Sequence, residues 1–248
     1  MKFRVNGKKY SPEGVLLLLP ALLLYGAVIV FPVCSTFYTS FFEWNGIKQQ
    51  AYRFVGLENY RTFFHDYQTA TAFKNVFMLA GTGVFLTIPI AFFLATVINQ
   101  KFRGLRLFKT FYFMPVVINR IAISLMFTFI LYPKMGPVTV LLREFGIRGV
   151  NILGNYATAM PAVCLIYMWC DAGFQMIVFS SGLAAIPDEI YEAAQIDGVS
   201  SFQKLRYITI PMMKSTFKIV LVFVFTGAFK MFDLVMYMNY STVKETGN

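Results

Sequence analysis

The sequence has few of the residues that usually build catalytic or metal-binding centres. Its 248 residues include one histidine, His65, and three cysteines. His65 stands beside Asp66, where a solvated loop histidine is the expected interpretation. The cysteines have neither the spacing of a zinc site nor the even number of a disulfide framework. We therefore expect Cys34, Cys164 and Cys170 to be small core residues, and we expect no bound metal.

Catalytic signatures are also missing from the sequence. It contains no HExxH zinc motif, no GxSxG nucleophile elbow and no GxxxxGK[ST] phosphate loop. We expect no enzymatic centre and no cofactor bound by this chain. If ATP drives its activity, another subunit must bind the nucleotide.

Charged residues are also few, and the sequence instead contains long apolar runs. Charged residues make up 14% of the chain and hydrophobic residues 57%, with 28 phenylalanines. A bilayer core of about 30 Å needs roughly 20 apolar residues in one helix. The alternation typical of membrane strands is absent, so we predict an all-α polytopic membrane protein. Its five expected spans cover residues 15–37, 73–98, 111–131, 156–180 and 217–240.

The positions of the basic residues predict an orientation. Lys and Arg number 22 against 12 Asp and Glu, but they are spread over short loops, which argues against a nucleic-acid surface. If residues 1–14 are cytoplasmic, the inner loops hold more Lys and Arg than the outer loops, as the positive-inside rule requires. Five spans then place residues 241–248 outside, and we expect the chain to be truncated before a last span.

A polar segment, residues 187–210, interrupts the apolar runs and predicts a hairpin of two short helices. Pro187 suits a first helical position. The pair Asp197 and Gly198 suits a helix end, and Ser200 with Gln203 has the spacing of a capping box. The second helix is expected to stop before Pro211. Such a hairpin is suited to docking, and the alternative is an amphipathic linker resting on lipid headgroups.

The same segment carries a motif. Glu192, Ala193 and Ala194 are followed after three residues by Gly198, and after nine more by Ile208, Thr209, Ile210 and Pro211. This resembles the EAA motif of ABC importer permeases, EAA-x3-G-x9-I-x-L-P, with Ile210 where Leu is usual. The stretches GLAAIP at 182–187, GAFKMFDL at 227–234 and VGLENY at 55–60 resemble the sugar-importing, maltose-type branch.

The resemblance implies a type I permease helical bundle of six spans, five of them visible here. It implies a cell-membrane (inner-membrane) protein that pairs with a second permease, as a heterodimer, to carry a carbohydrate or related polar solute. Two cytoplasmic subunits would bind ATP and Mg, and an outer solute-binding protein would deliver the solute. The coupling contact with an ATPase subunit is expected at Glu189, Glu192, Ala193, Ala194, Asp197, Gly198, Phe202 and Pro211.

Polar residues inside apolar runs are candidates for the solute pathway, because they are costly in lipid. On the fourth run, Tyr167, Cys170 or Asp171, and Phe174 share one helix face, where similar sugar permeases line their pathway. The Asp171 carboxylate could accept hydrogen bonds from sugar hydroxyls. The alternative is an ion pair with Arg120 or Lys230 that serves only packing.

The third and fifth runs add further pathway candidates. Arg120 either marks an acidic solute or is a paired, structural arginine. The fifth-run residues form a small, smooth helix face, and Lys230 and Asp233 resemble a family pair that we interpret as structural first. The candidates on these two runs are Asn119, Arg120, Gly227, Ala228 and Met231.

Two other functions remain open from the sequence. One is a membrane-embedded enzyme acting on a lipid-linked sugar, although Asp171 alone is a poor catalytic set. The other is a permease of the same fold for a non-sugar solute. The loop 132–155, with its Gly, Pro and mixed charges, is expected to contact the solute-binding protein.

Overall fold

The computed structural model describes residues 3–5, 8–10, 12–44, 53–99, 104–133, 135–147, 149, 151–231 and 238. The chain divides into two compact units, residues 1–72 and 73–248, and each is described by itself. Nearly all of the described elements are helices, with four very short strands. The predicted residues Asp233 and 241–248 lie outside the described residues, as does the end of the fifth predicted span.

The first unit contains a long apolar helix between two small hairpins. Strands β1 (Phe3–Val5) and β2 (Lys8–Tyr10) pair antiparallel. The helical run that follows consists of α1 (Pro12–Tyr25), the π-turn η1 (Gly26–Val30) and α2 (Phe31–Thr39). Within it, Leu16–Thr39 is long and apolar enough to cross a bilayer, and its most apolar stretch is not buried against the chain. Lipid or another subunit must cover this surface.

The end of α2 is held by the VGLENY stretch. Strands β3 (Phe42–Glu43) and β4 (Arg53–Phe54) pair, and Gly56 turns the chain with φ +58° into α3 (Glu58–His65). The side chain of Asn59 donates to the carbonyls of Ser40 and Phe42, at 2.9 and 3.0 Å. The Asn of this motif therefore has a local structural role.

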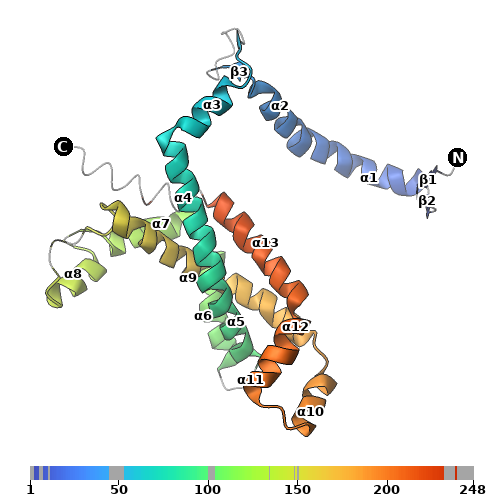
Figure 1. Cartoon of the computed structure of the whole chain (residues 1–248), viewed down its shortest axis with the longest axis vertical. Helices are drawn as coiled ribbons and strands as arrows, with labels where there is room; N and C mark the ends of the chain where they lie inside the picture. The colour runs from blue at the N-terminus through green and yellow to red at the C-terminus, as the bar shows by residue number, and fades with distance from the viewer. Residues whose placement is uncertain are drawn as a thin grey trace. The chain divides into compact units, whose positions relative to one another are not determined.

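The second unit is built around one long helix, α9 (Tyr156–Ala184). Packed against it are α5 (Ile88–Ile98), α6 (Leu105–Val117) and α13 (Lys214–Lys230) (Figure 1). Helix α5 continues α4 (Tyr67–Thr82) through the π-turn η2 (Gly83–Thr87), and Tyr67–Ile98 forms a second candidate span. One core lies between α5, α9 and α13, where the rings of Phe92, Phe179 and Phe217 pack edge-on or tilted with centroids 4.8–5.4 Å apart.

Three π-turns share one cause. In each, the residue after the π-turn donates its N–H to the carbonyl five residues back, and the next residue is a proline. A proline ring lacks an N–H and clashes with the carbonyl four residues back in an α-helix. A widened turn relieves this clash. The donor–acceptor pairs are Phe31–Gly26, Ile88–Gly83 and Ile210–Leu205, followed by Pro32, Pro89 and Pro211.

The third predicted run, 111–131, holds two helices. Helix α6 starts earlier, at Leu105, and α7 (Arg120–Ile130) follows it after a bend of 99°. The break has a local cause, because Ile118 is extended and the Asn119 side chain accepts the N–H of Ile121 at 2.8 Å. An asparagine that caps a helix start in this way ends the preceding helix. A short surface helix, α8 (Pro137–Glu144), comes next.

The predicted hairpin is present, with two corrections. Pro187, predicted at the first helical position, is instead the N-cap residue. Helix α10 (Asp188–Ile196) begins after its N-cap Pro187, and α11 (Ser201–Lys204), η3 (Leu205–Thr209) and α12 (Ile210–Met212) form the second arm. The prediction that this arm stops before Pro211 is wrong, because the π-turn lets the helix pass through the proline. It bends by 70° into α13, with Met213 at the break.

Length and composition thus give three helices able to cross a membrane among the described residues, or up to five if each bent pair is one span.

Candidate functional site

The polar centre of the second unit is an ion pair between the start of α7 and the middle of α9. The Arg120 Nη2 atom lies 2.5 Å from Asp171 Oδ1, and the two side chains are 29% and 13% exposed. Either charge alone would be costly within an apolar span, and each neutralises the other. Of the two partners considered for Asp171, the structure selects Arg120. Lys230 is exposed at the end of α13.

Helix α13 approaches this pair closely at a glycine. A Cβ added to Gly227 would lie 3.2 Å from the Tyr167 hydroxyl and 3.5 Å from Asp171 Oδ2. The Tyr167 hydroxyl donates to the Val224 carbonyl at 3.3 Å and is fully buried. Pathway candidates from the third, fourth and fifth runs therefore meet at one place, formed by Arg120, Tyr167, Asp171 and Gly227.

The other pathway candidates divide into packed and peripheral residues. Cys170 and Ala228 are buried in the neighbouring hydrophobic cluster, and Met231 packs against that cluster. Phe174 is 36% exposed and its ring packs edge-on against Phe223, with centroids 5.4 Å apart. Asn119 is exposed and caps α7. The structure therefore gives Asn119 a capping role.

Three buried polar atoms lack a hydrogen-bond partner within the described part of the chain: Arg120 Nη1, Gln175 Oε1 and Thr87 Oγ1. Gln175, which is 1% exposed, lies four residues after Asp171 on the same helix face. Sequence reasoning missed it, although a glutamine one turn from a carboxylate in an apolar run was a usable signal. The α9 face that carries Asp171 thus has spare hydrogen-bonding capacity.

The hairpin forms a second group of predicted residues. Its inner side is anchored by buried Ala194 and by the Tyr191 hydroxyl, 3.3 Å from Thr209 Oγ1. Gly198 has φ +70°, and Ser200 and Gln203 exchange the capping-box hydrogen bonds at 2.9 and 3.3 Å, as predicted. The remaining predicted coupling residues are exposed: Glu189, Glu192, Ala193, Asp197, Phe202 and Pro211.

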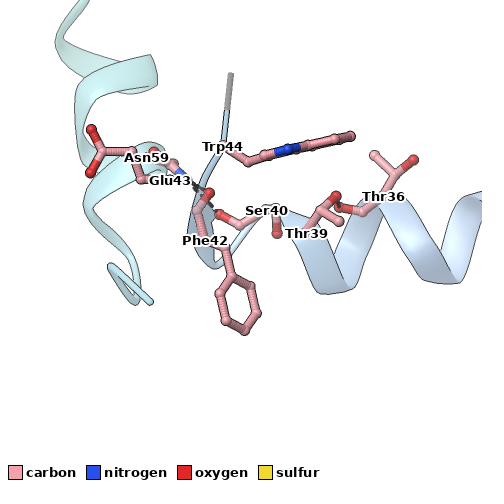
Figure 2. Close-up of a pocket in the computed structure, with 7 residues that line it drawn as sticks. All are labelled: Thr36, Thr39, Ser40, Phe42, Glu43, Trp44 and Asn59. Carbon is pink, nitrogen blue, oxygen red and sulfur yellow. Dashed lines mark hydrogen bonds between the residues drawn. The ribbon is translucent and has the colours of Figure 1, made fainter. Parts of the chain in front are cut away.

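A separate hollow of about 470 Å³ lies in the first unit at the end of α2. Figure 2 shows the Trp44 ring extending along the last turns of α2 towards Thr36 and Thr39. Glu43 also lines this hollow, 3.8 Å from the Arg53 guanidinium. None of its lining residues was predicted as a site residue.

No cluster of three His, Cys, Asp or Glu side chains suited to a metal occurs in the ranges that the structure describes. The interior polar centre consists of one compensated ion pair, a tyrosine and unpaired hydrogen-bonding atoms inside a helical bundle.

Comparison with known proteins identifies the class. The family model described as "Binding-protein-dependent transport system inner membrane component" matches residues 87–243, and the chain belongs to this family. It is a membrane-embedded, multi-pass permease subunit of an ABC transporter. It is a transporter component and not an enzyme, which decides against the lipid-linked-sugar alternative.

Particular relatives agree with this class. The chain is 32% identical over 233 residues to the probable ABC transporter permease protein YurN of Bacillus subtilis, covering 92% of this chain and 78% of that one. It is 30% identical to the arabinooligosaccharides transport system permease protein AraP of Bacillus subtilis, covering 94% and 74%. It is 27% identical to the trehalose/maltose transport system permease protein MalF of Thermococcus litoralis, covering 90% and 75%.

A solved structure shares the fold. A chain of a bacterial ABC transporter involved in the import of the acidic polysaccharide alginate superposes with a TM-score of 0.77 at 23% identity. The match covers 93% of this chain and 79% of that chain. The predicted type I permease helical bundle is confirmed.

Proposed function

We propose that this permease forms half of an import pathway for a carbohydrate or related polar solute. The observation that carries the proposal is the meeting of Arg120, Tyr167, Asp171 and Gly227 inside the bundle. Placing polar and charged groups inside an apolar membrane bundle costs free energy, so such groups indicate a pathway by default. Several relatives are named for oligosaccharides, which supports a saccharide over other polar solutes.

The chemistry of the centre suits hydroxyl groups. The Asp171 carboxylate uses Oδ1 for Arg120, so Oδ2 can accept from a solute hydroxyl, and Arg120 Nη1 can donate to a solute oxygen. The Phe174 ring, which is 36% exposed on α9, offers a surface for stacking on a sugar face. Gly227 lets α13 approach Tyr167 and Asp171 closely, because an added Cβ would lie only 3.2 Å from the Tyr167 hydroxyl.

We place the hairpin, residues 187–210, in the groove of a cytoplasmic ATPase subunit. Its exposed acids and the 69% exposed Phe202 ring provide a docking face, and its buried side packs on α9 and α5. Movement of the ATPase would reach the membrane helices through this packing. The assembly would contain a second permease, two subunits that bind ATP and Mg, and a solute-binding protein. The N-terminus would be cytoplasmic, in the inner membrane.

Substitution of Asp171 tests the pathway. In Asp171→Asn the amide oxygen keeps one hydrogen bond from Arg120, but the charge and one strong acceptor are lost. Uptake by the reconstituted complex at limiting solute is expected to fall by about tenfold or more, corresponding to at least one strong charge-assisted hydrogen bond. Asp66→Asn, at an exposed loop position, is the matched control. Unchanged uptake by Asp171→Asn would remove this carboxylate from the solute path.

A further inference from the structure

A cavity of about 620 Å³ lies where the membrane helix α5 ends beside the hairpin. It is within the second unit, and its walls come from α5, the end of α9, α10 and the α11–η3 arm. In Figure 1 these segments gather at one end of the unit. Its volume falls in the range of roughly 300–1,000 Å³ that ligand sites occupy. Five of its lining residues lie on the hairpin, but none is among the predicted coupling residues or the solute-pathway candidates.

The walls of the cavity are apolar on one side and polar on the other. Phe92 and Phe93 form the membrane side, with Leu205 on the hairpin. The other side carries Asn99, at the end of α5, and Ser201 and Lys204 on α11. The distance along the α5 axis from Phe92 and Phe93 to Asn99 is about 10 Å. This distance is comparable to the depth of the boundary between headgroups and acyl chains.

The polar wall is positively charged and has unused donors. No Asp or Glu lines the cavity, and Lys204 forms no ion pair with any residue in the described ranges. Its ammonium group lies 5.6 Å from the centre of the Tyr191 ring, which helps to hold it in place. The side chains of Asn99 and Ser201 make no hydrogen bond within the described part of the chain.

Other polar groups of the lining are already occupied. The Thr96 hydroxyl donates to the Phe93 carbonyl at 2.7 Å, and Thr209 bonds with Tyr191. The available chemistry is therefore one ammonium, one amide and one hydroxyl, next to two aromatic rings. A phosphate attached to an apolar chain meets all of these requirements, whereas a free phosphate leaves the aromatic wall uncovered.

We propose that this cavity binds one anionic phospholipid, with its phosphate against Lys204, Ser201 and Asn99 and its first acyl carbons against Phe92 and Phe93. Basic pockets between helices at a membrane surface bind anionic headgroups in this way. A lipid so placed bridges α5 and the hairpin arm.

Lipid binding to the assembled transporter complex tests the site directly. Native mass spectrometry of the complex, titrated with phosphatidylglycerol or phosphatidylcholine, is expected to show preferential retention of phosphatidylglycerol. Lys204→Gln is expected to weaken phosphatidylglycerol binding by about fivefold, the effect of one basic residue near an anionic surface, and to leave phosphatidylcholine binding unchanged. Lys218→Gln, an exposed lysine of α13 outside the cavity, is the control for charge and is expected to bind as the unsubstituted complex does.

A second pair of variants tests the apolar wall. Phe93→Ala is expected to weaken binding of both lipids several-fold, because a 65% exposed ring that covers acyl carbons is lost without a core cavity being formed. Phe85→Ala, 77% exposed on the preceding π-turn and outside the cavity, is its control. Equal retention of the two lipids, or unaltered phosphatidylglycerol binding by Lys204→Gln, would overturn the proposal. If equimolar glycerol phosphate displaced phosphatidylglycerol from the complex, the ligand would be a soluble anion and the proposal would be overturned.

Discussion

The pairing of Arg120 with Asp171 governs both stability and transport at the residue scale. The two side chains are 51 positions apart, come from different helices and are mostly buried. Removal of one partner leaves the other charge unpaired in a region of low dielectric, whereas replacement of both leaves no charge to solvate. This difference allows the structural role of the pair to be separated from its role in transport.

We expect Arg120→Met to destabilise the permease by about 3–5 kcal/mol, the usual cost of breaking a buried ion pair. The double variant Arg120→Met, Asp171→Asn should recover most of this loss in thermal unfolding of the purified complex, but not solute uptake. Recovery of uptake together with stability would show that the pair serves packing alone.

The sequence predicted the members of this centre better than it predicted their relations. Asp171, Tyr167 and Gly227 could be named from their positions in apolar runs, because a polar or very small residue there is unusual. Whether Arg120 or Lys230 pairs with Asp171 depended on the bend between α6 and α7, which sets where residue 120 lies. The spare hydrogen-bonding atom of Gln175 became visible only when its neighbours were known.

At the scale of elements, two glycines in helices have opposite surroundings. Gly173 of α9 faces α6, and a Cβ there would collide with the Tyr112 carbonyl oxygen. Gly81 of α4 has nothing within 4 Å of an added Cβ. Close helix approach in a membrane depends on such small residues.

We therefore expect Gly173→Ala to destabilise the bundle by about 1–3 kcal/mol through overpacking against backbone. Gly81→Ala should be neutral or stabilising by up to about 1 kcal/mol, since alanine favours helix. Thermal unfolding of the two purified variants makes the comparison, and equal stabilities would contradict the packing of α6 on α9.

The hairpin turn provides a second test at this scale. Gly198 has φ +70°, where a residue with a Cβ is strained by about 1–2 kcal/mol although the space around it is open. Gly198→Ala is expected to reduce uptake and solute-stimulated ATPase activity of the complex, and to leave capture by the solute-binding protein intact. Asn adopts this conformation more readily, so Gly198→Asn should retain most of the activity. Normal transport by Gly198→Ala would count against a docking role for the hairpin.

At the scale of the whole molecule, the chain contains helices long and apolar enough to span a membrane, and its sequence has no P-loop motif. Its exposed hairpin fits the proposed docking to a partner subunit, and lipid can cover the apolar surface of Leu16–Thr39. In the proposed assembly, the ATPase subunits supply the energy for uphill transport.

ATPase assays in proteoliposomes test this dependence. We expect stimulated hydrolysis and solute uptake only when the second permease, the ATPase subunits and a loaded solute-binding protein are all present. Omission of the binding protein should reduce stimulation to the basal rate. Uptake by the isolated chain would contradict the proposed assembly.

The sequence by itself determined the features that depend on near neighbours. The apolar runs, the capping box at Ser200, the left-handed turn at Gly198 and the family motif each depend on residues within a few positions or on a fixed spacing. The π-turns precede Pro32, Pro89 and Pro211, but Pro20, Pro115 and Pro161 lie inside α-helices without one, so the sequence alone did not predict them. Tertiary structure decided the partner of Asp171, the close approach at Gly227 and the cavity beside Lys204. These arise where helices distant in sequence pack together, and the bends that bring them together depend on the energy of the whole bundle.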